Sequence, residues 1–252
     1  MKSYTYIIAS LHGRTGKTLL ARLFADYAIF SGQHPEIFDT DAVERKLTAC
    51  FPGRAIPVDL ERVPDQMKLF DTLTAPAAVP RIVDVTHRSF RKFFQLMQEI
   101  GYAAEARVKE IEPVIVYIPD READSYEQGR LLRDHFKDCH FIVAENALIG
   151  KPDRQVQQSD HYKSLMGHDL NLYIPLLDPM FAGVVDDPKL SLSGFMSETA
   201  AERRPTAELS LAYLSLEARA SIGGWLKEMF GEIRRLGEVI KLRADLSFRR
   251  PL

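Results

Sequence analysis

Residues 11–18 have the sequence LHGRTGKT, whose residue types and spacing are those of a phosphate-binding turn. Gly13 and Gly16 let the backbone approach a phosphate closely, because neither carries a Cβ. Lys17 supplies a positive charge for the phosphates, and the Thr18 hydroxyl is suited to bind Mg²⁺. The standard pattern also has glycine five positions before the second of these glycines, where this chain has leucine. A chance turn with an ordinary solvated lysine therefore stays an alternative.

Acidic residues stand at the ends of two later segments that have the character of strands. Asp39 and Asp41 come at the end of residues 35–39 and just beyond it, and Asp84 lies in residues 81–85. Ligands of parallel α/β sheets bind at the carboxyl ends of the strands, where a carboxylate can hold Mg²⁺ through water. Each aspartate by itself could equally cap a helix or stabilise a turn. Three of them after a phosphate turn favour a metal–nucleotide site.

Segments with the character of strands and helices alternate along the chain. Short runs rich in β-branched, aromatic and other apolar residues predict strands at residues 4–10, 35–39, 55–60, 81–85, 113–118, 140–144 and 171–176. Apolar residues at helical spacing predict helices at residues 17–30, 63–73, 88–100 and 123–136. This alternation predicts an α/β fold, with a mostly parallel sheet covered by helices on both faces.

The C-terminal part is expected to be helical. A helical tract runs from about 207 to 242, and residues 178–206 are rich in Pro, Asp, Ser and Gly, which predicts an irregular connector. Residues 152–170 also have an irregular composition. One P-loop nucleotide-binding domain over residues 1–252, with a C-terminal helical extension at about 207–252, is simpler than two domains.

The C-terminal tract carries a broad apolar stripe with basic residues among it. The stripe consists of Ile222, Trp225, Leu226, Met229, Phe230, Ile233, Leu236, Val239 and Ile240. A basic amphipathic helix can lie on an anionic membrane, but a stripe this broad favours packing against the domain. The basic tail at residues 247–252 could touch DNA phosphates, although a solvated tail is the simpler interpretation.

Composition sets few limits on function. The chain has 252 residues and a net charge of −2, so its total charge requires neither a nucleic-acid nor a membrane partner and excludes neither. Its two cysteines are far apart in sequence and lack metal-ligand spacing. Its apolar runs are shorter than a membrane span needs, and the N-terminus lacks the character of a secretory signal. We therefore expect a cytoplasmic protein.

Five segments together resemble a known family, the ParA/MinD-type deviant-Walker ATPases. They are HGRTGKT at 12–18, FDTDA at 38–42, RIVDV at 81–85, PVIVYIPD at 113–120 and FIVAEN at 141–146. The family includes partitioning proteins, septum-site regulators and conjugation accessory proteins. The resemblance implies a homodimer with ATP and Mg²⁺ between its subunits. It also implies slow ATP hydrolysis that switches dimer to monomer, with DNA, a membrane surface or an accessory protein as the partner.

The resemblance also implies a role for each residue of the site. Lys17 and Thr18 would bind phosphate and Mg²⁺, and Asp41 would orient the attacking water. Asp39 and Asp84 would support Mg²⁺. Further nucleotide contacts are implied for His12, Gly13, Arg14, Thr15, Gly16 and Asn146. The last of these would contact adenine, with the alternative that its side chain caps a loop.

One position departs from the family pattern. The family has a signature lysine where this chain has His12, and a glycine where it has Arg14. Arg14 could replace the missing charge, because a guanidinium binds phosphate well, or it could be a solvated loop residue. Nucleotide binding is therefore a firmer expectation than hydrolysis by a lysine acting across the dimer.

Three hypotheses follow from these observations. The first is an ATP-binding molecular switch of the ParA/MinD type. The second is an ATP-dependent small-molecule ligase or kinase on the same scaffold, with a substrate pocket supplied by residues 152–170. The third is a degenerate module that holds nucleotide without turnover.

Overall fold

The computed structural model describes residues 2–200 and 214–247. In this part of the chain seven strands form one sheet in the order β3-β2-β4-β1-β5-β6-β7, and all neighbouring pairs are parallel. The strands are β1 (Ser3–Ala9), β2 (Glu36–Asp39), β3 (Ala55–Pro57), β4 (Arg81–Asp84), β5 (Ile111–Tyr117), β6 (His140–Asn146) and β7 (Asn171–Ile174). The expected parallel α/β sheet is confirmed.

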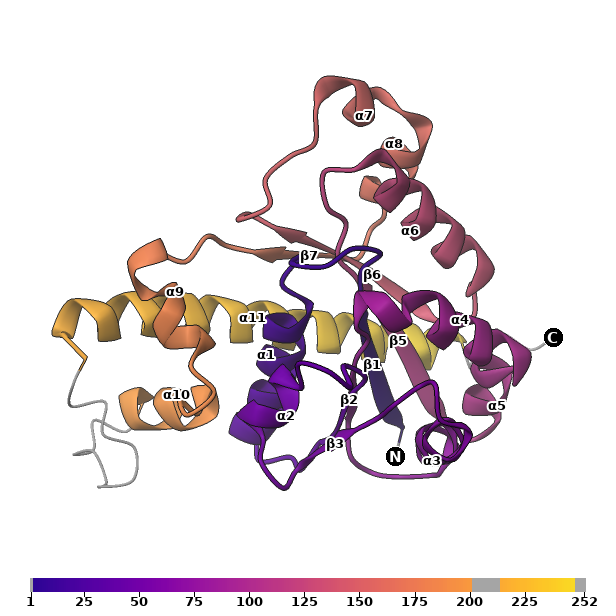
Figure 1. Cartoon of the computed structure of the whole chain (residues 1–252), viewed down its shortest axis with the longest axis horizontal. Coiled ribbons are helices and arrows are strands. Elements are labelled where there is room, and N and C mark those ends of the chain that lie inside the picture. The colour runs from indigo at the N-terminus through magenta and orange to yellow at the C-terminus, as the bar shows by residue number, and fades with distance from the viewer. Residues whose placement is uncertain (1, 201–213, 248–252) are drawn as a thin grey trace.

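Helices cover both faces of this sheet (Figure 1). One face carries α1 (Lys17–Phe30), α2 (Lys46–Cys50), α9 (Pro179–Asp186), α10 (Leu192–Ala200) and α11 (Leu216–Ser247). The other carries α3 (Val63–Thr74), α4 (Phe90–Glu99), α5 (Tyr102–Val108), α6 (Ala123–His135) and α8 (Asp160–Met166). The short helices η1 (His87–Ser89) and α7 (Arg154–Gln158) complete the described elements.

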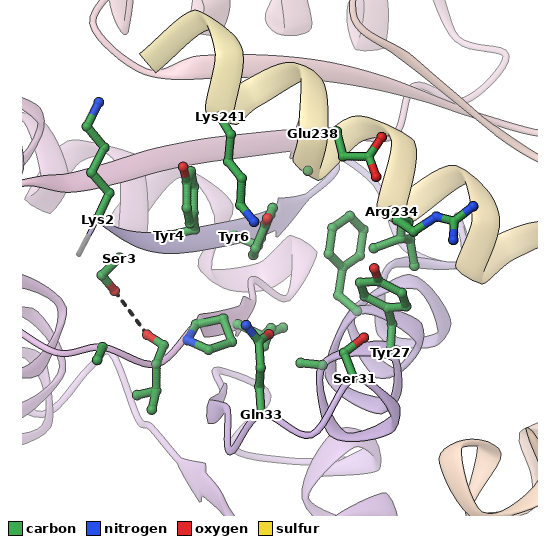
Figure 2. A pocket seen from close by; sticks show the side chains of 18 of the residues that line it. Lys2, Ser3, Tyr4, Tyr6, Tyr27, Ser31, Gln33, Arg234, Glu238 and Lys241 are labelled. Carbon is green, nitrogen blue, oxygen red and sulfur yellow. Dashed lines mark hydrogen bonds between the residues drawn. The ribbon is translucent and has the colours of Figure 1, made fainter. Parts of the chain in front are cut away.

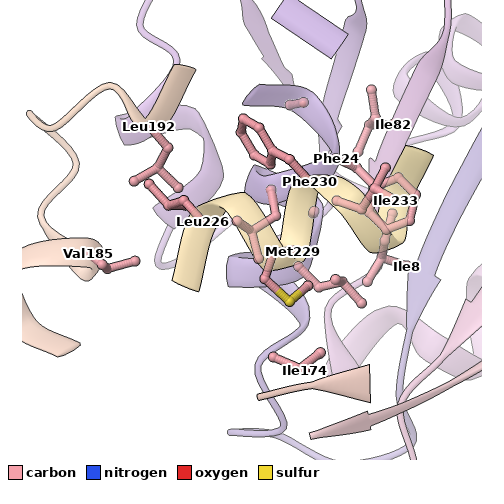
Figure 3. Close-up of a cluster of buried hydrophobic side chains, with 14 of the residues drawn as sticks. Ile8, Phe24, Ile82, Ile174, Val185, Leu192, Leu226, Met229, Phe230 and Ile233 are labelled. Atoms are coloured by element: carbon pink, nitrogen blue, oxygen red, sulfur yellow. The ribbon is translucent and has the colours of Figure 1, made fainter. Parts of the chain in front are cut away.

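Two apolar cores result from the alternation of side chains along the strands. In the central strand β1, Ile7 and Ile8 are both fully buried but belong to different cores, because successive side chains of a strand point to opposite faces. Figure 3 shows the core on the side of α1 and α11, where Phe24, Phe230 and Ile233 meet the sheet residues Ile8, Ile82 and Ile174.

The long helix α11 belongs to this first core. Its apolar stripe, which includes Ile222, Leu226, Met229, Leu236 and Ile240, is buried against the domain. Trp225 is also buried, and its indole N–H donates a 2.8 Å hydrogen bond to the carbonyl of Pro175. The expectation that this helix packs on the domain is therefore confirmed. No helix among the described residues is long and apolar enough to cross a membrane.

Two segments predicted to be irregular are helical. The stretch 178–206 contains α9 and α10, and the stretch 152–170 contains α7 and α8. The residues that indicated loops are helix caps: the Asp153, Ser159 and Asp178 side chains accept hydrogen bonds from the first turns of α7, α8 and α9. The short helices α2 and α5 were not predicted. The start of the predicted C-terminal tract, 207–213, and the tail at 248–252 lie outside the described residues.

A buried charged pair ties α1 to the α9–α10 segment. The Arg22 guanidinium donates hydrogen bonds to the carbonyls of Val185, Asp187 and Leu190. Asp26, one turn later on α1, accepts a 2.9 Å hydrogen bond from the backbone N–H of Ser193. Because both side chains are almost fully buried, these bonds fix the helix that begins at the phosphate turn.

Candidate nucleotide-binding site

The sheet brings the predicted site residues to one edge. β1 lies between β4 and β5, so the chain leaves β1 toward one side of the sheet and later returns to the other. This is a topological switch point, at which ligands of open α/β sheets bind beyond the carboxyl ends of the strands. In the strand register Asp84 pairs with Ile8 on one side and with Asp39 on the other. The turn after β1 and the two aspartates therefore meet.

The turn at residues 11–18 contains two residues in the left-handed region and leads directly into α1. Gly16 is the N-cap of α1 and has a φ of 91°, in the left-handed region that favours glycine. Arg14 also lies in that region, with a φ of 61°, although it is not glycine. The amide N–H groups of the first helical turn have no partner within the helix and, with the helix dipole, favour an anion.

Both glycines of the turn are approached closely by other side chains. A Cβ on Gly13 would lie 3.3 Å from the His87 ring, and a Cβ on Gly16 would lie 2.7 Å from Asn146 Nδ2. Asn146 donates a 3.1 Å hydrogen bond from Nδ2 to the carbonyl of Thr15, and its Oδ1 accepts one from the N–H of Leu148. Asn146 thus holds the phosphate turn and also caps its own loop, while the adenine contact stays a prediction.

Lys17 is buried at the centre of the turn. Its ammonium donates to the carbonyl of His12 at 2.7 Å and lies 3.4 Å from Thr15 Oγ1. Burial lowers the pKa of Lys17, and the negative charges of Asp84, Asp120 and Asp41 oppose that shift. A buried ammonium with only neutral partners in hydrogen-bond distance is prepared to interact with an anion such as a phosphate.

Thr18 and Asp84 form the other half of the site. The Thr18 hydroxyl donates a 2.7 Å hydrogen bond to Asp84 Oδ2, and Asp84 Oδ1 is buried without a hydrogen-bond partner among the described residues. Burial raises the pKa of Asp84 to about 7, opposed by the bond from Thr18 and reinforced by Asp39. An orphaned carboxylate oxygen beside a threonine hydroxyl fits Mg²⁺, which prefers oxygen ligands and retains several waters.

The other two aspartates are held by backbone groups. Both carboxylate oxygens of Asp39 accept hydrogen bonds, one from the N–H of Asp41 and the other from the N–H and hydroxyl of Thr48. Asp41 accepts from the N–H groups of Val43 and Glu44 and from the Thr86 hydroxyl. Burial raises the pKa of Asp41, but these bonds and Arg88 outweigh it and lower the pKa, so the side chain stays ionised. This geometry favours Asp84 over Asp39 as the residue nearest a metal.

His12 is held within its own chain. Its Nδ1 lies 2.6 Å from Asp120 Oδ2, and its Nε2 lies 3.5 Å from Asp124 Oδ2. Arg14 is exposed and forms no ion pair or hydrogen bond with the described residues. The histidine at the signature-lysine position is therefore engaged by carboxylates, while Arg14 is available to a ligand or partner.

Two residues of the site were given no role by the sequence. Asp120 follows β5 just as Asp41 follows β2, so an acidic residue beyond a strand's carboxyl end was the signal that could have identified it. His87 packs on Gly13, and burial, with Lys17 and Arg88, lowers its pKa. The position of His87 depends on how η1 folds over the turn, and residue spacing alone does not predict that.

Among the described residues no three His, Cys, Asp or Glu side chains form a metal-binding group.

No protein-family model and no curated protein matches this sequence. Among solved structures the chain is similar to the MinD cell division protein of Aquifex aeolicus, with 14% identity, a TM-score of 0.47, and coverage of 92% of this chain and 97% of that chain. It is also similar to the MinC:MinD cell division protein complex of Aquifex aeolicus, with 11% identity, a TM-score of 0.41, and coverage of 92% and 96%.

A third similar structure is a plasmid partition protein from Borrelia burgdorferi, with 12% identity, a TM-score of 0.37, and coverage of 69% of this chain and 89% of that chain. MinD and partition proteins are also the kinds of protein that the five sequence segments resemble. Because the TM-scores are below 0.5, the assignment of the site rests on its own geometry, and the α/β fold is shown by the sheet itself.

Proposed function

We propose that this protein is an ATP-binding molecular switch of the ParA/MinD type, with ATP and Mg²⁺ held at the phosphate turn. The observation that carries the proposal is the arrangement at the start of α1. There Lys17 is buried next to Thr18, whose hydroxyl donates to Asp84, and the other carboxylate oxygen of Asp84 is buried without a hydrogen-bond partner among the described residues. A buried carboxylate oxygen without a partner beside a buried ammonium is the kind of arrangement that a bound ligand would complete.

Each group has a task when nucleotide is bound. The amides of the turn and the first turn of α1 would bind the phosphate oxygens, and Lys17 would add its charge to the β- and γ-phosphates. Thr18 and Asp84 would hold Mg²⁺, which neutralises phosphate charge when it is bound. Asp41, kept ionised by its hydrogen bonds, would orient an attacking water. Slow hydrolysis at a homodimer interface belongs to the same proposal.

A second candidate, nucleotide binding without turnover, is favoured by the state of His12. The family pattern requires a mobile cation at this position, whereas His12 is held by Asp120 at 2.6 Å. If Arg14 does not supply that cation, the chain binds nucleotide and releases no phosphate. DNA, a membrane surface or an accessory protein is the proposed partner in either case.

A titration with a fluorescent ATP analogue and Mg²⁺ tests nucleotide binding. We expect Lys17→Ala to weaken binding by about 10-fold or more, because a charge-assisted hydrogen bond to phosphate is worth about 1.5–3 kcal/mol. Lys68→Ala, which alters an exposed lysine on α3, is the matched control and should bind as the original protein does. Equal affinity of all three proteins would refute the proposal.

Phosphate release by the same proteins separates the two candidates. Turnover that disappears in Lys17→Ala supports the switch. Saturable nucleotide binding with no Lys17-dependent phosphate release supports the module without turnover.

A further inference from the structure

A cavity of about 470 Å³ lies at the end of the sheet opposite to the phosphate turn. It is enclosed by the start of β1, the loop before β4, the C-terminal half of α1, and α11 (Figure 2). We call it the tyrosine cavity, after Tyr4, Tyr6 and Tyr27 in its wall. Its size is within the range of pockets that hold small molecules.

Aromatic rings form much of the wall. Tyr4 and Tyr6 are stacked with their centroids 6.4 Å apart, and Tyr6 lies 4.9 Å from Phe24 of α1. Both tyrosines lie on the same face of β1 as Ile8, which is fully buried, yet they are only partly covered. The helix above them contributes Gly237, where an added Cβ would meet no other atom within 4 Å. At this end of β1 the apolar core therefore ends, and a space lined by aromatic rings begins.

The cavity wall contains three cations, Lys2, Arg234 and Lys241, and two carboxylates, Glu238 and Asp245. Lys2 is paired with Glu112 at 3.2 Å and with Asp245 at 3.6 Å. By contrast, neither Lys241 nor Arg234, both on α11, forms an ion pair with a described residue. Figure 2 shows the Lys241 side chain directed toward the Tyr6 hydroxyl, whereas the Glu238 carboxylate points away from the tyrosines.

We propose that the tyrosine cavity binds a small planar aromatic anion. Aromatic side chains favour offset or edge contacts with a ligand ring, and an unpaired ammonium at the edge of the ring-lined space favours a carboxylate, sulfonate or phosphate group. The hydroxyls of Tyr6 and Ser31 and the amide of Gln33 add hydrogen-bonding groups. This site is separate from the phosphate turn and does not depend on the proposed function.

A fluorescence titration with 8-anilinonaphthalene-1-sulfonate, an anion with a planar naphthalene ring, tests the proposal. We expect saturable binding that Gly237→Phe weakens at least 10-fold, because the new ring occupies the cavity. Gly231→Phe is the matched control, since Gly231 lies on the same helix, also has open space at its Cβ, and is not in the cavity wall. Circular dichroism and thermal unfolding establish that each variant is folded.

The charge requirement is tested with Lys241→Met. This change should weaken the sulfonate probe roughly 5-fold, about 1 kcal/mol for a partly exposed ion pair, and leave its uncharged analogue N-phenyl-1-naphthylamine unaffected. If Lys241→Met bound both probes equally more weakly, or bound the sulfonate probe as tightly as before, the proposal that the ligand is an anion would be overturned.

A third comparison distinguishes the tyrosine cavity from the phosphate turn. Binding of the sulfonate probe should be unchanged in Lys17→Ala. Loss of the probe in that variant, or full binding to Gly237→Phe, would show that the probe binds elsewhere and would overturn the proposal.

Discussion

At the scale of single residues, the site buries ionisable groups whose charged forms are costly without a ligand. Lys17 is buried with a lowered pKa, and Asp84 is buried with a pKa raised to about 7. Burial disfavours the charged form of each group, so both shifts have the same physical cause. Groups of this kind are expected at functional sites, where binding compensates for the desolvation.

Asp84→Asn should make the ligand-free protein more stable at pH 8. The raised pKa means that the folded carboxyl keeps its proton to about pH 7, whereas the unfolded one loses it near pH 4. The stabilisation from that proton is present below pH 4 and is lost as the pH rises through 7. We expect a gain of about 1–3 kcal/mol at pH 8 and almost none at pH 4, measured by urea unfolding at both values.

The same substitution should weaken nucleotide binding in the presence of Mg²⁺. An amide lacks the negative charge that the metal requires, so we expect about a 10-fold or greater loss of affinity for the Mg²⁺ complex of the ATP analogue. A variant that is less stable at pH 8, or that binds the complex unchanged, would contradict the assignment of Asp84.

Gly16→Ala should weaken nucleotide binding, because the new methyl group would lie 2.7 Å from Asn146 Nδ2 and would displace the side chain that holds the turn. Gly32→Ala is the matched control: its φ is 77°, so it carries a similar backbone strain, but its Cβ would meet no other atom within 4 Å. Both variants should lose about 1 kcal/mol of stability from the strain. If the nucleotide titration showed equal losses of affinity in Gly16→Ala and Gly32→Ala, the contact of Asn146 with Gly16 would have no role in binding.

The place of the phosphate turn between β1 and α1 could be predicted because local spacing specifies it, whereas the roles of its residues stay predictions. Gly13, Gly16, Lys17 and Thr18 occupy one continuous turn between a strand and a helix. The partners of His12 could not be predicted in this way, because Asp120 reaches it only after β5 has paired with β1.

At the scale of elements, α1 connects the site to the rest of the molecule through Arg22 and Asp26. The buried Asp26 has a pKa raised by desolvation, which the bonds from Ser193 and the charge of Arg22 oppose. Because Arg22 donates to three carbonyls around α9 and α10, it also replaces the water that those carbonyls would need. The orientation of α1 therefore depends on residues more than 160 positions away.

Arg22→Met should destabilise the fold by about 3–5 kcal/mol at pH 8, because it leaves the buried Asp26 carboxylate without its charged partner. The loss should be smaller at pH 5 than at pH 8, because the raised pKa of Asp26 makes protonation of its carboxyl easier as the pH falls. Arg91→Met, at an exposed position on α4, serves as the control. Chemical unfolding of both variants at the two pH values is the measurement, and a loss below 1 kcal/mol would contradict this account.

The elements that prediction missed share a physical explanation. Pro179 after Asp178 has the composition of a turn, yet proline is tolerated in the first turn of a helix and aspartate is a preferred cap. The helices α9 and α10 are short, and their stability comes from packing on α1 and α11. Tertiary contacts of this kind cannot be deduced from composition, whereas the long helices α1 and α11 were predicted.

At the scale of the whole molecule, the two candidate sites lie at opposite edges of the sheet, and α1 contributes to both. The phosphate turn begins this helix, and Phe24 and Tyr27 of its second half line the tyrosine cavity. The stripe of α11 is buried in the same core, so a membrane could bind that stripe only after α11 had left the domain.

The oligomeric state with nucleotide provides the decisive test at this scale. If ATP completes an interface over the phosphate turn, light scattering should show a dimer with a non-hydrolysable ATP analogue and Mg²⁺, and a monomer with ADP. Arg14, exposed and unpaired among the described residues, is suited to cross that interface, so Arg14→Ala should weaken dimerisation more than it weakens nucleotide binding. A protein that stays monomeric with saturating analogue would exclude the dimeric switch, and binding in one subunit would then account for the buried charges of Lys17 and Asp84.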